Sequence, residues 1–242
     1  MHSGFQTVIG LLYPPRCLGC GAMVDSDFGL CGTCWRDTPF IGGTVCDACG
    51  VPLQGESDGT RIECDECMAA PRPWSQGRAA LIYRDAARRI VLRLKHGDQS
   101  EVAQPAAKWL AQAGRSFLTS RTLIAPVPLH WSRLLKRKYN QSALLSGALG
   151  AETGLAQCPD LLVRRRKTES QEGKNSDQRF ANLDGAIAVH PRRRHRIAGR
   201  PVVIVDDVMT SGATFAACAQ ACLEAGAADV SVLALARVAK DA

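Results

Sequence analysis

The pattern of hydrophobic and polar residues from position 79 onward predicts alternating strands and helices. Short apolar runs between turn-forming residues are typical of strands, and longer segments with apolar positions three or four apart are typical of helices. The predicted strands are residues 79–83, 123–125, 161–163, 186–189, 202–205 and 229–236; the predicted helices are 86–95, 101–118, a segment ending near 152, and 215–225. This alternation favours an α/β fold with a parallel-dominated sheet flanked by helices.

The 242-residue chain divides into a cysteine-rich N-terminal region and this α/β domain. The predicted boundaries are 1–70 for the N-terminal region, 71–78 for a linker rich in proline and glycine, and 79–242 for the α/β domain. Residues 166–181 are polar and lack periodicity, which predicts a long mobile loop of the kind that closes over an active site.

Four C-x-x-C pairs lie within residues 17–67. Each pair can turn two thiolates toward one point, and two pairs together make a tetrahedral zinc site. We predict two structural zinc ions, and binding of metal should be coupled to folding of this region. The predicted ligands are Cys17, Cys20, Cys31, Cys34, Cys46, Cys49, Cys64 and Cys67. Sequential pairing of neighbouring C-x-x-C pairs is the simplest arrangement, and cross-braced pairing is the alternative. Disulfides, redox-active pairs and iron–sulfur ligation are the competing interpretations.

Charge is distributed unevenly along the chain. Residues 17–67 contain nine acidic and two basic residues, a net charge of −7, which leaves +14 for the rest of a chain whose total is +7. The basic α/β domain therefore favours polyanionic ligands such as nucleotides or nucleic acid. No apolar run reaches the length of a membrane span. Residues 5–13 are apolar but lack a basic leader and a cleavage site, so they are expected to form a short packing helix rather than a signal peptide. A cytoplasmic location is expected, and no oligomeric state is predicted.

Residues 202–214 suggest a phosphate site at the end of a buried strand. A run of β-branched residues is followed by two carboxylates, then by a small, hydroxyl-rich turn, then by an alanine-rich helix. Backbone N–H groups at such a helix N-terminus bind phosphate well, and the neighbouring carboxylates can bind a sugar diol or Mg²⁺. The competing interpretation is an ordinary buried strand with an acidic turn and a helix cap.

This stretch resembles the phosphoribosyl-pyrophosphate (PRPP) signature of type I phosphoribosyltransferases. The resemblance implies that Asp206 and Asp207 contact the ribose hydroxyls and that the turn wraps the 5′-phosphate. The implied PRPP-binding residues of this stretch are Asp206, Asp207, Val208, Met209, Thr210, Ser211, Gly212, Ala213 and Thr214.

Nearly the whole chain, in order, resembles the ComF family, in which a double zinc ribbon precedes a phosphoribosyltransferase-like domain. The pieces that carry the resemblance are the four C-x-x-C pairs, residues 94–97, 126–130 and 139–141, a Thr168, Gln171, Arg179 and Asn182 series, and the 206–214 signature. The resemblance implies that Lys95, His96 and Gly97 contact pyrophosphate and that residues 166–182 form a flexible hood, although residues 169–170 and 175–177 depart from the pattern usual in relatives.

Two functions remain open at this point. The main prediction is a phosphoribosyltransferase that binds Mg²⁺ with PRPP, or a related phosphorylated ribose, and transfers the phosphoribosyl group to an unidentified acceptor; Asp206, Asp207 and Lys95 would be its catalytic residues. The alternative is a non-catalytic nucleotide-binding or single-stranded-DNA-binding protein that acts in DNA uptake or processing. Its candidate contacts are three basic segments, residues 133–138, 164–167 and 192–196, beside which aromatic residues are scarce.

Overall fold

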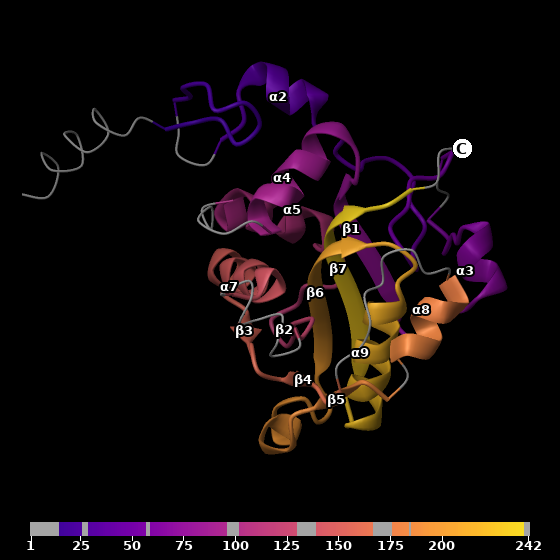
Figure 1. Ribbon diagram of the computed structural model, residues 1–242. Helices are drawn as coiled ribbons and strands as arrows, with labels where there is room; N and C mark the ends of the chain where they lie inside the picture. The colour runs from indigo at the N-terminus through magenta and orange to yellow at the C-terminus, as the bar shows by residue number, and fades with distance from the viewer. Residues whose placement is uncertain are drawn as a thin grey trace, which may run out of the picture.

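The computed structural model shows a sheet with helices on both faces and a small cysteine-rich region at one end (Figure 1). The structure describes residues 15–25, 29–56, 59–95, 102–129, 139–166, 176–183 and 185–239. Among these residues, no helix has both the length and the apolar character needed to cross a bilayer.

Five parallel strands form the central sheet of the α/β domain. Their order across the sheet is β1-β7-β6-β2-β3, and every neighbouring pair is parallel. Their bounds are Gln76–Ile82 (β1), Asp229–Arg237 (β7), Pro201–Met209 (β6), Leu123–Pro126 (β2) and Ala156–Gln157 (β3). The long apolar runs of β6 and β7 are buried on both faces because helices cover both sides, as expected for a parallel sheet.

Helices pack on both faces of this sheet (Figure 1). Leu94, Leu110 and Leu145 share one buried cluster with Val203 and Leu235, whereas α9 packs against the other face through residues such as Phe215. The helices of the first face are Asp85–Lys95 (α4), Ala103–Ala113 (α5) and Gln141–Thr153 (α7), and α9 spans Ala213–Glu224. The predicted parallel-dominated α/β fold is therefore confirmed.

A second, two-stranded sheet lies beside the main one. Its strands, Leu162–Arg164 (β4) and Ile187–Val189 (β5), are antiparallel and are followed by the 3₁₀ helix η2, Pro191–Arg196.

The mobile-loop prediction for residues 166–181 is wrong in its second half, because helix α8 spans Ser176–Leu183. Leu183 is buried in a cluster with Ala186 and Ala213, so a tertiary contact stabilises a helix that its polar sequence does not reveal. Residues 167–175 of the predicted loop lie outside the described residues.

The described part of the cysteine-rich region contains two short helices and packs along the edge strand β1. The helices are Gly32–Asp37 (α2) and Asp65–Ala69 (α3). Ile41 N–H donates to Ala80 O at 2.9 Å, and Gly77 N–H donates to Asp47 O at 2.8 Å. The unpaired backbone of β1, which begins within the predicted linker, is thus covered by this region.

Candidate active site and metal sites

The eight cysteines of the C-x-x-C pairs form two clusters of four. In each cluster the four sulfur atoms lie within 4.8 Å of one another. The Sγ atoms of Cys20 and Cys31 are 3.8 Å apart, and those of Cys49 and Cys64 are 3.7 Å apart. A tetrahedron with zinc–sulfur bonds of about 2.3 Å has edges of about 3.8 Å, so both clusters fit zinc.

The pairing is sequential, which resolves the alternative left open by the sequence. The first site consists of Cys17, Cys20, Cys31 and Cys34, and the second of Cys46, Cys49, Cys64 and Cys67. All eleven cysteines are free thiols, and the remaining three, Cys158, Cys218 and Cys222, are buried in the core. The two Cys₄ sites fit structural zinc rather than disulfides.

The two acidic residues at the end of β6 have different partners. Asp206 Oδ1 accepts hydrogen bonds from Ser142 Oγ at 2.6 Å and from the Asp207 N–H at 2.9 Å. Asp207 Oδ2 lies 3.2 Å from Lys95 Nζ in an ion pair. Ser142 is the second residue of α7, whose cap is Asn140, and Lys95 is the last residue of α4. Helices on one face of the sheet therefore hold both carboxylates.

The environment of Asp206 favours its protonated form. Burial raises the pKa of the Asp206 carboxyl to about 7, and the negative charge of Asp207 raises it further, while hydrogen bonds from Ser142 and the Asp207 backbone and the charge of Lys95 oppose the rise. A carboxyl that titrates near neutral pH beside an ion-paired carboxylate is the kind of arrangement found at functional sites.

The turn that follows β6 forms an open hollow at the N-terminus of α9. Gly212 caps this helix with φ of +82°, a conformation that glycine adopts without strain. Ala216 N–H makes the first helical hydrogen bond, to Gly212 O, so the amides of residues 213–215 precede it and have no intrahelical partner. The hollow is lined by Asp206 and residues 208–215. Its amides and hydroxyls suit a phosphate group.

The structure brings together most of the residues predicted for this site. Asp206 and residues 208–214 line the hollow, and Lys95 is held beside them through Asp207. His96 and Gly97 lie outside the described residues, as does the basic segment 133–138. The functional roles of the placed residues stay predictions.

Three residues that the sequence did not point to also contact the site. Ser142 binds Asp206, while Arg72 and Arg237 donate hydrogen bonds to backbone carbonyls of the turn after β6. Ser142 directly follows the Tyr139-Asn140-Gln141 segment, which was a usable signal. The two arginines are isolated in sequence from the turn, and nothing in their local pattern indicated a contact with it.

Comparison with known proteins finds one matching family model and relatives that align over most of the chain. A protein-family model described as Double zinc ribbon domain matches residues 8–68. The chain is 34% identical to the DNA utilization protein YhgH of Salmonella typhimurium over 217 residues, which cover 88% of this chain and 92% of that protein. It is 27% identical to Competence protein F of Haemophilus influenzae, over 92% of this chain and 96% of that protein.

One of the similar solved structures matches part of the chain. Glutamine phosphoribosylpyrophosphate (PRPP) amidotransferase from B. subtilis, complexed with ADP and GMP, is 20% identical and matches with a TM-score of 0.37. The match covers 55% of this chain and 26% of that one.

Proposed function

Because this chain belongs to the ComF family of competence and DNA utilization proteins, we propose that it binds PRPP with Mg²⁺ and transfers the phosphoribosyl group to an acceptor. The observation that supports this proposal is the arrangement at the end of β6. A cation on α4, two acidic residues on β6 and the turn before α9, with its backbone amides and hydroxyls, are adjacent. PRPP has pyrophosphate, ribose hydroxyls and a 5′-phosphate in the matching order.

Each group has a distinct task in the proposed reaction. The turn 210–214 anchors the 5′-phosphate, and the carboxylates of Asp206 and Asp207 accept hydrogen bonds from the ribose hydroxyls. The bond between C1 and the pyrophosphate oxygen breaks, its electron pair leaves with pyrophosphate, and the acceptor's lone pair forms the new bond at C1. Lys95 stabilises the charge on the departing pyrophosphate, and Mg²⁺ arrives with the substrate and neutralises part of the same charge.

The ion pair between Lys95 and Asp207 supports one continuous site. In PRPP the pyrophosphate at C1 is next to the 2-hydroxyl of the ribose. A lysine that binds pyrophosphate should therefore be near a carboxylate that binds the ribose, and their charged atoms are 3.2 Å apart. Ligand binding would exchange this ion pair for contacts of each residue with the substrate.

The direct test is calorimetric titration of PRPP into zinc-loaded protein, with and without Mg²⁺. We expect Mg²⁺-dependent binding that is lost when Asp206→Asn and Asp207→Asn are combined, with zinc content unchanged. Asp160→Asn is a matched control, because Asp160 is also an ion-paired carboxylate but contacts Arg193 on η2. Undiminished PRPP affinity in a folded double variant would refute the site. If binding is observed, pyrophosphate release in the presence of candidate acceptors then tests transfer.

Single-stranded DNA is the second candidate ligand. The names of the relatives, DNA utilization protein and Competence protein, favour it, as do the exposed side chains of Arg192 and Arg194 on η2. Binding through such groups should weaken steeply as salt rises, because each phosphate contact releases counterions. Affinity for an oligonucleotide that is unchanged by salt and by Arg192→Glu with Arg194→Glu would exclude this surface.

A further inference from the structure

Arg72 contacts both the second Cys₄ site and the turn after β6. Its Nε donates to Cys67 Sγ at 3.4 Å, and its Nη1 donates to Ser211 O at 2.9 Å. The guanidinium is held over the ring of Trp74, with Cζ 5.8 Å from the ring centroid. Trp74 is itself 4% exposed and donates from Nε1 to Ala48 O, between two ligand cysteines. The side chain of Arg72 is therefore fixed from several directions.

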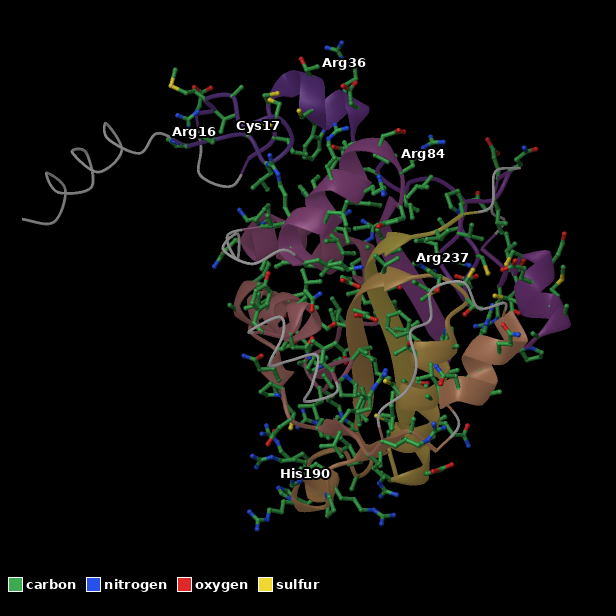
Figure 2. All side chains as sticks on the ribbon, in the orientation of Figure 1. Arg16, Cys17, Arg36, Arg84, His190 and Arg237 are labelled. Atoms are coloured by element: carbon green, nitrogen blue, oxygen red, sulfur yellow. The ribbon has the colours of Figure 1, made fainter. Side chains whose placement is uncertain are left out.

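Arg237 makes a second connection of the same kind from the end of β7. Its side chain is buried; Nη2 lies 3.7 Å from Cys49 Sγ, and Nη1 donates to Thr210 O at 2.7 Å and to Met209 O at 3.4 Å. Figure 2 shows Arg237 at the upper end of the sheet, well separated from Cys17 of the first site. Two arginines thus connect two ligand cysteines with three consecutive carbonyls, that of the last residue of β6 and the first two of the turn.

Charge explains why arginine occupies both positions. Four thiolates around a divalent zinc carry a net charge of −2, which the two guanidinium groups offset in part, because Arg237 also pairs with Glu66 Oε2 at 3.9 Å. The first site differs: among the described residues, the N–H groups that contact its sulfurs belong to the backbone of Gly19, Cys31 and Cys34. The connection to the turn is therefore a feature of the second site.

The hydrogen bonds to the carbonyls determine where the amides of the turn point. In a trans peptide the C=O and the next N–H point in opposite directions. When Thr210 O and Ser211 O accept from the arginines on the side of the zinc ribbon, the N–H groups of Ser211 and Gly212 are turned away from it. These amides then add to those of the first turn of α9 as donors to an anion.

We propose that Arg72 and Arg237 are positioning residues that transmit the presence of zinc in the second Cys₄ site to the anion-binding turn 210–214. With the metal bound, the thiolates hold both guanidinium groups in place, and these hold the carbonyls of the turn. Loss of zinc, or of either arginine, releases the turn and weakens binding of the phosphate end of the ligand. The identity of that ligand rests on the function proposed above, whereas the link between zinc and the turn does not.

The test compares Arg72→Lys with Arg61→Lys in the full chain. A lysine ammonium cannot reach both partners with the fixed geometry of a guanidinium. Arg61 is the matched control, because it lies in the same ribbon and joins Glu63 to a backbone carbonyl, that of Ser75, away from the turn. The measurements are zinc content, backbone ¹⁵N order parameters of Ser211 and Gly212 without ligand, and affinity for ribose 5-phosphate and for pyrophosphate separately.

We expect Arg72→Lys to retain two zinc ions, to lower the order parameters of Ser211 and Gly212 from about 0.85 toward 0.6 and to weaken ribose 5-phosphate binding about tenfold, with pyrophosphate binding unchanged. Arg61→Lys should match the parent protein. Unchanged order parameters in Arg72→Lys, or equal weakening of both ligands, would overturn the proposal, since general destabilisation affects both ends of the site. If the parent protein binds neither ligand, the proposed function fails, and the order parameters alone decide the role of Arg72.

Discussion

Lys95 Nζ and Asp207 Oδ2 are 3.2 Å apart, although Lys95 ends helix α4 and Asp207 lies near the end of the central strand β6. Both side chains are largely removed from solvent, with exposed fractions of 24% and 12%. A second carboxyl, that of Asp206, is adjacent, so one cation serves two acidic groups. Because the same charged groups would bind the substrate and set the pKa of Asp206, substitutions here should affect both ligand affinity and the free energy of unfolding.

Replacing Lys95 with glutamine should selectively weaken pyrophosphate binding. The substitution removes a charge-assisted hydrogen bond to the ligand, which is worth about 1.5–3 kcal/mol, or roughly ten- to a hundredfold in affinity. Calorimetric titration of pyrophosphate with Mg²⁺ measures the effect. Lys108→Gln, an exposed position on α5, is the control and should bind as the parent protein does. Equal pyrophosphate affinities for the two variants would remove Lys95 from the site.

Asp206 should make the protein less stable as the pH rises toward neutrality. Its pKa is about 7 in the folded state, mainly because of burial, and near 3.8 when unfolded. Between these values the folded state binds the extra proton, so the stabilising effect of the proton is complete below about pH 4 and is lost as the pH rises through 7. Asp206→Asn removes this titration and should be more stable than the parent at pH 8, by about 1 to 2 kcal/mol after allowance for partial solvation.

Denaturant unfolding at several pH values between 5 and 8 checks this sign. Asp160 is the contrasting control: the hydrogen bond from Arg193 lowers the pKa of its carboxyl. Its contribution should therefore be present at neutral pH and be lost toward acid, so Asp160→Asn should not flatten the slope above pH 5. A parent protein whose stability rises steadily from pH 5 to 8, with Asp206→Asn following the same curve, would contradict the assignment.

The metal ligands and the central strand could be predicted from sequence because their signals are local. A C-x-x-C pair sets its own geometry, and an uninterrupted apolar run such as that of β6 has few stable positions other than the middle of a parallel sheet. The same is true of the turn after β6, where small residues, carboxylates and a helix start occur within a few positions.

The contacts that complete the site were not predictable, because they join distant parts of the chain. Arg72 and Ser211 are 139 positions apart, and Ser142 and Asp206 are 64 apart. A lone arginine in a proline-rich segment has the same local pattern whether its side chain is solvated or fixed by a turn and a thiol. Helix α8 was missed for a related reason, since burial of Leu183 depends on α9.

Chelation should remove zinc in two phases. The first site includes the exposed Cys20 and the partly exposed Cys31, whereas three of the four ligands of the second site are buried. We expect faster release from the first site, measured with a chromophoric chelator, and earlier proteolysis within residues 17–37 than within 46–69. The backbone order parameter of Ser211 should fall only in the second phase. Release of both ions in one phase, or a fall of this order parameter in the first phase, would show that the sites do not differ in this way.

Gly212→Ala should impair the phosphate-binding turn beyond its effect on stability. Gly212 has φ of +82°, and a Cβ there would lie 3.1 Å from Trp74 Cη2. Gly226 provides a matched control, since its φ is +97° but a Cβ there would have no described heavy atom within 4 Å. Both substitutions should lower the free energy of unfolding by about 1 kcal/mol, because alanine is strained at positive φ. Only Gly212→Ala should displace the turn and Trp74, and so weaken ribose 5-phosphate binding. Equal ligand affinities for the two alanine variants would mean that close packing of the turn against Trp74 has no part in binding.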